Sequence, residues 1–337
     1  MEKYLLLCDW GTSSFRLGLY NIVEEKLVDE IQSTDGIAGI YRSWQNGQQD
    51  NNEISKEHLF RETLLRQVTV LSNKSTIDLS GTPIAISGMA SSSIGIVNIP
   101  YADTPFDLDG RQVKSREFPA KANFPHAIFL ISGVRGEQDV MRGEETQLIG
   151  IWSLLAETGR PSEGIFIFPG THSKHIYVKD EKLMHFSTFM TGELYQLLAR
   201  HSILKDSVQP DNDLEQSAGN LQSFKKGVQQ SLKTGLLNTL FTVRTNQLLN
   251  QCNKTENAFY LSGLLIGSEL QELRKAALQP LFLCSGKNLF GLYKIAMEEL
   301  GLAGRTDFIP PATVELAAMQ GQKIIYTQYL KNKMLHE

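Results

Sequence analysis

The start of the chain most constrains its fold, because it encodes two strands joined by a tight polar turn. The apolar run Tyr4–Asp9 ends at an acid, and the turn Gly11–Ser14 leads into the alternating pattern Phe15–Tyr20, which predicts a second strand. The turn offers backbone N–H groups, hydroxyls and a carboxylate, which together can hold a phosphate tail and its magnesium ion. An ordinary hairpin with a small polar turn is the alternative.

Composition narrows the class of protein. The chain has 337 residues, of which 41% are hydrophobic and 21% charged, so it is typical of a globular protein of about two domains. A net charge of −4 gives no basic field for nucleic acid or an anionic membrane. The three cysteines are far apart and have no zinc spacing. With no apolar run long enough to span a membrane, we expect a reduced, cytoplasmic protein.

The next part of the chain alternates strands with helices. Lys26–Ser33 predicts a third strand, Thr34–Asn52 is rich in Gly, Gln and Asn and predicts a loop, and Ser55 is a good N-cap for a helix. Pro83–Met89 predicts a buried strand that ends in a glycine, whereas Pro100–Pro125 predicts an irregular region. Strands that follow helices favour an α/β fold, in which ligands collect at the carboxyl ends of strands.

Acids gather around the start of a predicted helix in the middle of the chain. Asp139 and Arg142 precede Gly143, and Glu144 and Glu145 open a helix through about Glu157. This run is chemically dense enough for catalysis. Compensation of the helix dipole by the two glutamates is the alternative.

A second strand, turn and strand repeats the design of the N-terminus. Gly164–Phe168 and His175–Val178 flank the turn Pro169–Lys174, which has the same Gly-Thr-x-Ser character as the first turn. Two such turns about 160 residues apart suggest two related halves that face one another.

The last third of the chain is mostly helical. Phe259–Gly263 is predicted to lead into a helix that starts at Leu264, and Pro280–Cys284 predicts a strand followed by Ser285, Gly286 and another helix. In the terminal helix, Ala312–Leu330, a patch of small residues should allow another helix to approach closely. Its members are Ala317, Ala318, Gly321 and Gln322.

The familiar phosphate-binding motifs are absent from the sequence, since neither a P-loop nor G-x-G-x-x-G occurs. The order of hairpins, helices and the later strand–Ser–Gly–helix element resembles the actin, hexokinase and heat-shock chaperone superfamily. The resemblance implies an α/β fold of two RNase H-like domains, each with a mixed five-stranded sheet flanked by helices, around an interdomain cleft. We expect domains 1–140 and 141–337, with hinge helices near 144–157 and 312–330.

Within that superfamily the chain resembles the 2-dehydro-3-deoxygalactonokinase family. After Gly88 and Met89 that family reads Gly-Ser-Arg-x-Gly-Trp, whereas this chain has Ala90–Ile96, which lacks the Arg and the Trp. The matching segments span nearly the whole chain: Asp9–Thr12 with Arg16, Ser87–Met89, Asp139–Gln147, Pro169–Lys174, Phe189–Leu194 and Tyr260–Gly267.

The resemblance implies a kinase that transfers the ATP γ-phosphoryl to the 6-hydroxyl of 2-dehydro-3-deoxy-D-galactonate in galactonate catabolism. The altered loop at Ala90–Ile96 leaves open a kinase of the same fold for another 2-keto-3-deoxy sugar acid or polyol. A non-catalytic, actin-like ATP-binding protein is the alternative from another class. The partner is then a small molecule rather than nucleic acid or a membrane, and a homodimer stays open.

The resemblance also implies roles for particular residues. Asp9 holds Mg²⁺ through water, and Lys174 either offsets charge on the γ-phosphoryl or lies on the strand exterior. Residues expected to bind ATP are Gly11, Thr12, Ser13, Gly170, Thr171, His172, Ser173 and Lys174 at the phosphates, and Gly263, Gly286 and Asn288 at the adenosine. Residues expected at the sugar acid are Gly88, Met89, Thr191 and Glu193.

Two functions need charged side chains. A base must accept the hydroxyl proton, and we favour Asp139 slightly over Glu144, which occupies the place of the Asp found in related sugar kinases. The substrate carboxylate needs a cation, and the guanidinium fork suits it, so Arg16 and Arg142 are the candidates. For Arg16 the alternative is an outward position on its strand.

Overall fold

The computed structural model describes residues 3–49, 55–157, 159, 161–211, 217–233, 235–275 and 279–336. The chain folds into two compact units. Unit 1 contains Met1–Arg160, Glu181–Met184 and Glu315–Glu337, and unit 2 contains Pro161–Asp180 and His185–Val314. The first division therefore falls after residue 160 rather than at the expected 140, and most of the C-terminal helix belongs to unit 1.

Unit 1 is built on a sheet of strand order β3-β2-β1-β4-β8-β7. The first three strands form an antiparallel meander, as predicted, and β4 and β8 continue in parallel from β1. The strands are β1 (Tyr4–Trp10), β2 (Phe15–Asn21), β3 (Lys26–Ser33), β4 (Ile84–Gly88), β7 (Ser115–Phe118) and β8 (Ile128–Ile131). A smaller sheet joins β5 (Ala102–Asp103), β9 (Val134–Arg135) and β10 (Val140–Met141).

The two faces of this sheet carry different side chains, because successive residues of a strand point to opposite faces. Cys8, Trp10 and Leu17 belong to the hydrophobic core beneath α2 (Lys56–Ser75), which Ser55 caps by accepting from the N–H of His58. Asp9 and Arg16 are directly paired across β1 and β2 and so lie on the opposite face.

The expected loop at Thr34–Asn52 is wrong for most of its length. Residues Ile37–Gln49 form helix α1, and residues 50–52 lie outside the described residues. The Gly, Gln and Asn that suggested a loop are tolerated because the helix is held at its start by the first turn, as described below, rather than by strong helix-forming residues.

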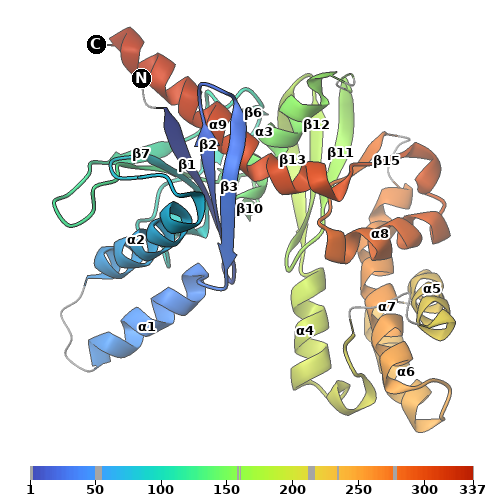
Figure 1. Cartoon of the computed structure of the whole chain (residues 1–337). Coiled ribbons are helices and arrows are strands. Elements are labelled where there is room, and N and C mark those ends of the chain that lie inside the picture. Colours follow the sequence, from blue (N-terminus) through green and yellow to red (C-terminus); the bar gives the residue numbers. More distant parts are fainter. Residues whose placement is uncertain are drawn as a thin grey trace. The chain divides into compact units, whose positions relative to one another are not determined.

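The opposite face of the unit 1 sheet is covered by two helices that approach each other closely, α3 (Glu144–Leu154) and α9 (Pro311–His336). A Cβ at Gly150 would lie 1.9 Å from the carbonyl oxygen of Ala317, and one at Gly321 equally close to that of Thr146. The prediction of a small-residue patch that permits close approach is confirmed. Figure 1 shows α9 as the long red helix that crosses this unit.

Unit 2 repeats the strand order of unit 1. Its sheet runs β13-β12-β11-β14-β15, with β11 and β12 antiparallel and β11, β14 and β15 parallel. The strands are β11 (Glu163–Phe168), β12 (Ser173–Lys179), β13 (Lys182–Phe189), β14 (Leu281–Leu283) and β15 (Thr306–Phe308), and β6 (Phe106–Asp107) pairs with Lys182 and Leu183 of β13, residues that belong to unit 1. Each unit thus contains the same five-strand arrangement, which confirms that the two hairpins belong to related halves.

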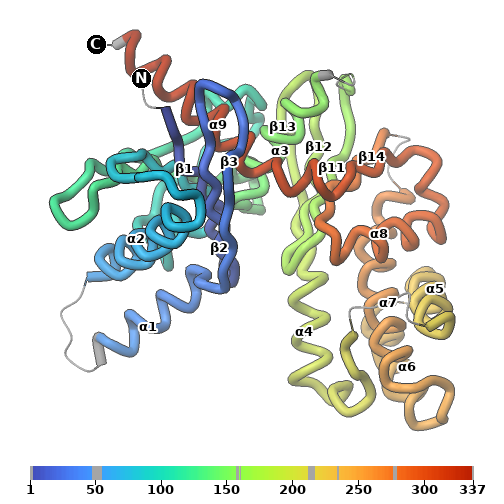
Figure 2. Tube along the Cα trace, viewed as in Figure 1, coloured from blue at the N-terminus to red at the C-terminus, as the bar shows by residue number. Residues whose placement is uncertain are grey.

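The helices of unit 2 pack mainly around the long helix α7 (Lys254–Lys275), which can be followed in the tube of Figure 2. Gly227 and Gly263 bring two of them together, because a Cβ at either position would lie 2.2 Å from a backbone oxygen of the other helix. The expectation that Phe259–Gly263 precedes a helix is wrong, since these residues lie inside one. The helices are α4 (Thr191–His201), α5 (Ala218–Ser231), α6 (Leu236–Leu248), α7 (Lys254–Lys275) and α8 (Lys287–Glu299).

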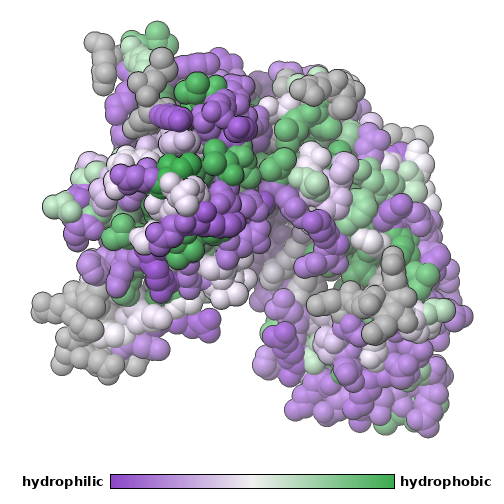
Figure 3. All heavy atoms as spheres, in the orientation of Figure 1, coloured by the Kyte–Doolittle hydropathy of each residue, from purple (hydrophilic) through white to green (hydrophobic). Residues whose placement is uncertain are grey.

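Surface composition agrees with the sequence. Hydrophilic residues cover most of the face drawn in Figure 3, grey atoms aside, and hydrophobic residues appear in separate groups. No helix in the described part of the chain is both long enough and apolar enough to cross a membrane.

Candidate active site

The first turn is held by the helix that follows the third strand. The N–H groups of Ile37 and Ala38, at the start of α1, donate to the carbonyls of Gly11 and Thr12, each at 3.0 Å. A Cβ at Gly36 would lie 2.4 Å from the Cα of Ser13, so only glycine allows this approach. The helix start therefore fixes the direction of the turn's carbonyls.

Because the carbonyls of this turn face the helix, its amide groups are available on the other side. Within the turn, the N–H of Gly11 donates to Ser14 at 2.9 Å, but among the described residues the N–H groups of Thr12 and Ser13 donate to no backbone carbonyl. Both residues are exposed. Successive outward N–H groups in a turn form an anion-binding concavity.

The second turn is built in the same way. Gly192, at the start of α4, lies so close that a Cβ there would be 2.5 Å from the carbonyl oxygen of Gly170. The N–H of Glu193 donates to the carbonyl of Thr171 at 3.0 Å. Both predicted phosphate loops are thus strand–turn–strand elements whose carbonyls are turned toward a helix start. In the second turn the N–H of Gly170 donates to Ser173 Oγ, and among the described residues the N–H groups of Thr171 and His172 donate to no backbone carbonyl.

Asp9 is the penultimate residue of β1 and lies in an acidic and partly enclosed position. Gly88 of β4 lies beside it, since a Cβ there would be 3.4 Å from Asp9 Oδ1 and 2.6 Å from the carbonyl oxygen of Trp10. Burial, followed by the negative charge of Glu144, raises the pKa of Asp9 to about 6, against the opposing charge of Arg16. A divalent cation beside this carboxylate would relieve both effects, so Asp9 fits the expected Mg²⁺ role.

The start of α3 brings two further carboxylates to this region. A Cβ at Gly143 would lie 3.3 Å from the Cα of Gly88, and its φ of +112° favours glycine. Glu144 accepts from the N–H of Arg142 at 3.2 Å, and Glu145 accepts from that of Gly143 at 2.7 Å. These bonds agree with the alternative interpretation, in which the two glutamates compensate the helix dipole.

Glu145 is buried although it is acidic, with only 1% of its surface exposed. Burial and the charge of Glu144 raise its pKa to about 7, while bonds from Thr146 and Gly143 oppose the rise. Asp9, Glu144 and Glu145 therefore form one electrostatically coupled acidic cluster. Among the described residues, no group of three His, Cys, Asp or Glu is arranged to hold a metal ion by itself.

Asp139 lies apart from this cluster, in the turn between β9 and β10. Its side chain accepts from the N–H of Val140 at 2.7 Å, and its carbonyl accepts from Gly136 at 2.9 Å. It lines an open hollow of about 560 Å³ together with Asp103 and Arg135. The structure thus couples Glu144, rather than Asp139, to Asp9.

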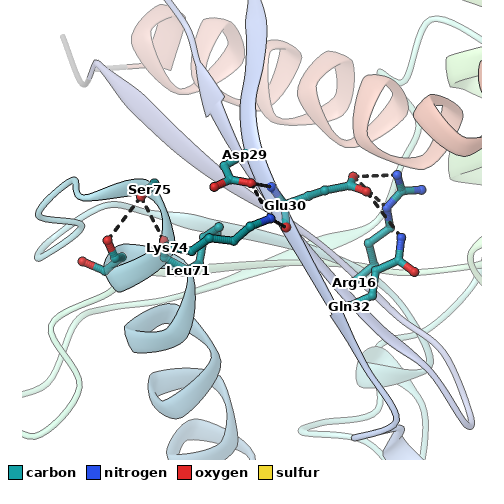
Figure 4. Close-up of polar contacts among 8 residues, drawn as sticks. Arg16, Asp29, Glu30, Gln32, Leu71, Lys74 and Ser75 are labelled. Carbon is teal, nitrogen blue, oxygen red and sulfur yellow. Dashed lines mark hydrogen bonds and ion pairs between the residues drawn. The ribbon is translucent and has the colours of Figure 1, made fainter.

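Arg16 is engaged within unit 1. Its Nε and Nη2 atoms donate to Glu30 at 3.1 and 2.6 Å, and Nη1 donates to the carbonyl of Glu315 at 2.5 Å. Figure 4 shows Arg16 and Glu30 reaching toward each other from neighbouring strands. Arg16 therefore ties the sheet to the start of α9 while its positive charge acts on Asp9.

Arg142 is buried and holds the loop that follows β4. Its Nη1 donates to the carbonyl and the hydroxyl of Ser91 at 2.6 and 2.5 Å, and Nη2 donates to the carbonyl of Ile99 at 3.3 Å. The guanidinium also lies 4.3 Å from the ring centre of Tyr101. Met89 is half-buried at the start of the same loop. The shape of this loop, which departs from the family pattern, thus depends on Arg142.

The remaining side chains of the second turn are bound within unit 2. His172 Nε2 lies 2.5 Å from Glu193 Oε2. Thr191 donates its hydroxyl to Glu269. Lys174 is 4% exposed, and its Nζ lies 3.5 Å from the carbonyl of His172. The alternative that placed Lys174 on the strand exterior is wrong.

The three residues expected at the adenosine have different surroundings. Gly286 is the N-cap of α8 with open space where a Cβ would be, and Asn288 is exposed beside it. Gly263 instead lies inside α7 against α5. The structure therefore gives Gly263 a helix-packing role and leaves Gly286 and Asn288 accessible.

Sequence patterns missed four buried polar residues. Gln322 of α9 donates to the carbonyl of Cys8 and the hydroxyl of Ser87, both at 2.7 Å, beside Asp9. For Glu145 the sequence indicates either catalysis or compensation of the helix dipole, but not the burial that raises its pKa. The other two, Glu269 and Tyr293, lie on helices far along the chain from the turn they contact, and a polar residue within an apolar helical stretch was their only signal.

Comparison with known proteins decides the family. The model of the family described as 2-keto-3-deoxy-galactonokinase matches residues 9–315. The chain belongs to this family. It is also 30% identical to the 2-dehydro-3-deoxygalactonokinase of Escherichia coli (strain K12), over 91% of this chain and 96% of that protein.

Solved structures of related proteins agree with the fold of this galactonokinase-family chain. A crystal structure of a candidate 2-dehydro-3-deoxygalactonokinase from Sinorhizobium meliloti superimposes with a TM-score of 0.76 and 27% identity, covering 96% of each chain. The activator of 2-hydroxyisocaproyl-CoA dehydratase from Clostridium difficile, solved with bound ADPNP, has a TM-score of 0.50 and 11% identity, covering 98% of this chain and 97% of that one. The second likeness supports the two-domain ATPase fold alone.

Proposed function

We propose that this chain is an ATP- and Mg²⁺-dependent kinase that phosphorylates the 6-hydroxyl of 2-dehydro-3-deoxy-D-galactonate. The observation that carries the proposal is the family match over residues 9–315. The paired turns at Gly11–Ser14 and Pro169–Lys174 support it, because each presents backbone amides of the kind that bind phosphate. Three widely spaced cysteines, none of them paired, support a cytoplasmic location.

The transfer has a simple balance. The sugar 6-oxygen forms a bond to the γ-phosphorus, the bond from that phosphorus to the bridging oxygen breaks, and ADP leaves with the electron pair. The sugar hydroxyl proton must pass to a base. Catalysis of such a transfer rests mainly on positioning and on neutralising charge. Bound Mg²⁺ supplies positive charge that offsets the phosphates.

Residues of this chain supply the rest. Asp9 would hold the metal ion through water, since Mg²⁺ keeps much of its hydration. We propose that Glu144, rather than Asp139, is the base, because the charge of Glu144 raises the pKa of Asp9 and Asp139 is held in the β9–β10 turn.

The arginines take indirect roles in this proposal. The guanidinium of Arg16 already binds Glu30 and the carbonyl of Glu315, and that of Arg142 binds Ser91 and Ile99. We therefore propose that Arg16 tunes Asp9 and that Arg142 shapes the substrate loop. Either would reach the sugar carboxylate only by giving up these bonds.

An assay of ADP release tests the proposal. The purified protein is offered the galactonate-derived 2-keto-3-deoxy acid and its gluconate-derived epimer, with ATP and Mg²⁺. We expect the first acid to give the higher kcat/KM, and ³¹P NMR of the product to show a 6-phosphate ester. A higher kcat/KM for the epimer or for a polyol would favour the same-fold alternative, for which the altered loop at Ala90–Ile96 is the motive.

A further inference from the structure

A buried polar network centred on Glu269 lies beneath the second turn, and no role above is assigned to Glu269 or to Tyr293. Glu269, on α7, is 3% exposed and accepts from several side chains. Its Oε2 accepts from the hydroxyls of Tyr293, at 2.7 Å, and of Thr191. Its Oε1 lies 3.0 Å from Nε2 of His175 on β12. A buried carboxylate is costly unless it is hydrogen-bonded in this way.

The network continues from Glu269 into the turn. The hydroxyl oxygens of Tyr293 and Ser173 lie 3.0 Å apart, and both side chains are almost fully buried. The N–H of Gly170, the glycine of the turn, lies 3.3 Å from Ser173 Oγ. Glu269 is thus linked to the turn through two hydroxyl groups.

The hydrogen bonds that link Glu269 to the turn each have a defined donor and acceptor. Tyr293 donates its hydroxyl proton to Glu269 Oε2. The tyrosine has one proton, so it must accept from the hydroxyl of Ser173, whose remaining lone pairs are then free to accept from the N–H of Gly170. One end of the turn is therefore oriented from a residue on a different helix.

A second link reaches the opposite side of the same turn. Thr191, which donates to Glu269, is the first residue of α4. The next two residues contact the turn directly, Gly192 against the carbonyl of Gly170 and Glu193 through its N–H to the carbonyl of Thr171. Glu269 thus anchors both the hydroxyl chain and the helix start that orient the turn.

We infer that Glu269 and Tyr293 are positioning residues for nucleotide binding, which hold the amides of the Pro169–Lys174 turn in the geometry that accepts phosphate. The inference rests on the proposed role of this turn in binding ATP. Neither residue needs to touch the nucleotide, since Tyr293 is 1% and Glu269 3% exposed.

Replacement of Tyr293 by Phe tests the inference, with Tyr260→Phe as its matched control. Tyr260 is equally buried in unit 2, and its hydroxyl lies 2.8 Å from that of Thr242, away from the turn. We expect Tyr293→Phe to raise the Kd for an ATP analogue, measured calorimetrically without sugar acid, about five- to tenfold, which corresponds to the loss of one hydrogen bond. Tyr260→Phe should leave that Kd unchanged.

Kinetics separate positioning from general damage to the fold. In Tyr293→Phe the KM for ATP should rise about as much as the Kd, whereas the KM for the sugar acid should stay within about twofold. An unchanged Kd in Tyr293→Phe, or equal rises in both tyrosine variants, would overturn the inference. If the wild type binds no ATP analogue, the proposed function fails as well. If it binds the analogue but phosphorylates no sugar acid, only the proposed acceptor fails.

Variants of Glu269 supply a rescue test that survives poor folding of a single mutant. In Glu269→Gln the amide oxygen can still accept from Tyr293 and Thr191 while the NH₂ group faces His175, so we expect the Kd for the analogue to stay within about twofold. Glu269→Leu leaves the two hydroxyls without an acceptor and should raise the Kd more than tenfold. Equal Kd values for the Gln and Leu variants would contradict the role of the bond directions.

Discussion

Three carboxylates, those of Asp9, Glu144 and Glu145, form the acidic cluster of unit 1. Burial, followed by the charge of Glu144, raises the pKa values of Asp9 and Glu145 to about 6 and about 7. These two groups therefore take up protons within about one unit of neutral pH. Burial and repulsion between like charges both disfavour the ionised forms of Asp9 and Glu145, so their protonation is sensitive to pH and to bound cations.

Glu145→Gln should make stability less dependent on pH. Because the pKa of Glu145 is raised in the folded state, its contribution is complete below its unfolded pKa and is lost as pH rises through the folded value. A rise from 4.5 to about 7 corresponds to about 3 kcal/mol. Denaturant unfolding between pH 5 and pH 8 should therefore show a shallower fall for the variant. The exposed Glu62→Gln is the control, and equal slopes in all three proteins would refute the coupling.

The choice of base is also decided by single residues. Glu144→Gln should lower kcat by about 10²- to 10⁴-fold, the usual contribution of a general base. Asp139→Asn should keep kcat within about threefold, because this side chain is held by the N–H of Val140 in its turn. Steady-state kinetics at saturating ATP measure both variants. The reverse order of effects would return the role to Asp139.

Helices α3 and α9 meet at glycines. The contact of α3 with α9 depends on Gly150 and Gly321, each facing a carbonyl oxygen of the other helix. A methyl group at either point would meet backbone, which cannot move aside as a flexible side chain can. Any larger residue at Gly150 or Gly321 would therefore force the two helices apart.

Gly321→Ala should separate these helices and destabilise the protein by about 1 to 3 kcal/mol, the usual cost of overpacking. Gly39→Ala on α1 is the matched control, because nothing lies within 4 Å of a Cβ there. It should instead stabilise the protein by about 0.5 to 1 kcal/mol through helix propensity. Urea unfolding of the two variants measures both changes, and a Gly321→Ala protein as stable as the wild type would contradict the packing.

Local patterns predicted most elements and failed where distant contacts decide. The two hairpins, the Ser55 cap and the small-residue patch were visible because each depends on neighbours in sequence or on a strong spacing. Helix α1 was missed because its start is held by the first turn, and the helical state of Phe259–Gly263 was missed because α5 packs against it. The roles of Arg16 and Glu269 depend on partners on other elements, which no local spacing reveals.

For the whole molecule, the repeated strand order explains why one chain carries two turns of the same build, which we propose bind phosphate. β1, β2 and β3 with α1 correspond to β11, β12 and β13 with α4, and both sheets continue in parallel from their first strand. The family match over residues 9–315 takes in both repeats. Whether catalysis and the fold each need a metal ion can be tested separately.

Removal of Mg²⁺ should stop catalysis without unfolding the protein. Among the described residues, no group of three His, Cys, Asp or Glu could hold a metal ion, and we expect the fold to be stable without one. Excess EDTA should therefore abolish phosphoryl transfer and leave the Tm of the nucleotide-free protein unchanged within about 1 °C. A large fall in Tm would indicate a structural metal.

If the two turns recognise phosphate through their backbone, the residues that most restrict the sequence lie outside the turns. In the proposed function the turns bind phosphate through amides, so the exposed side chains of Thr12 and Ser13 should be free to vary as long as the backbone keeps its path. That path is set by Gly36 and Gly192, where any side chain would strike the turn. In a mutational scan, the loops that touch phosphate should thus tolerate substitution better than the helix starts behind them.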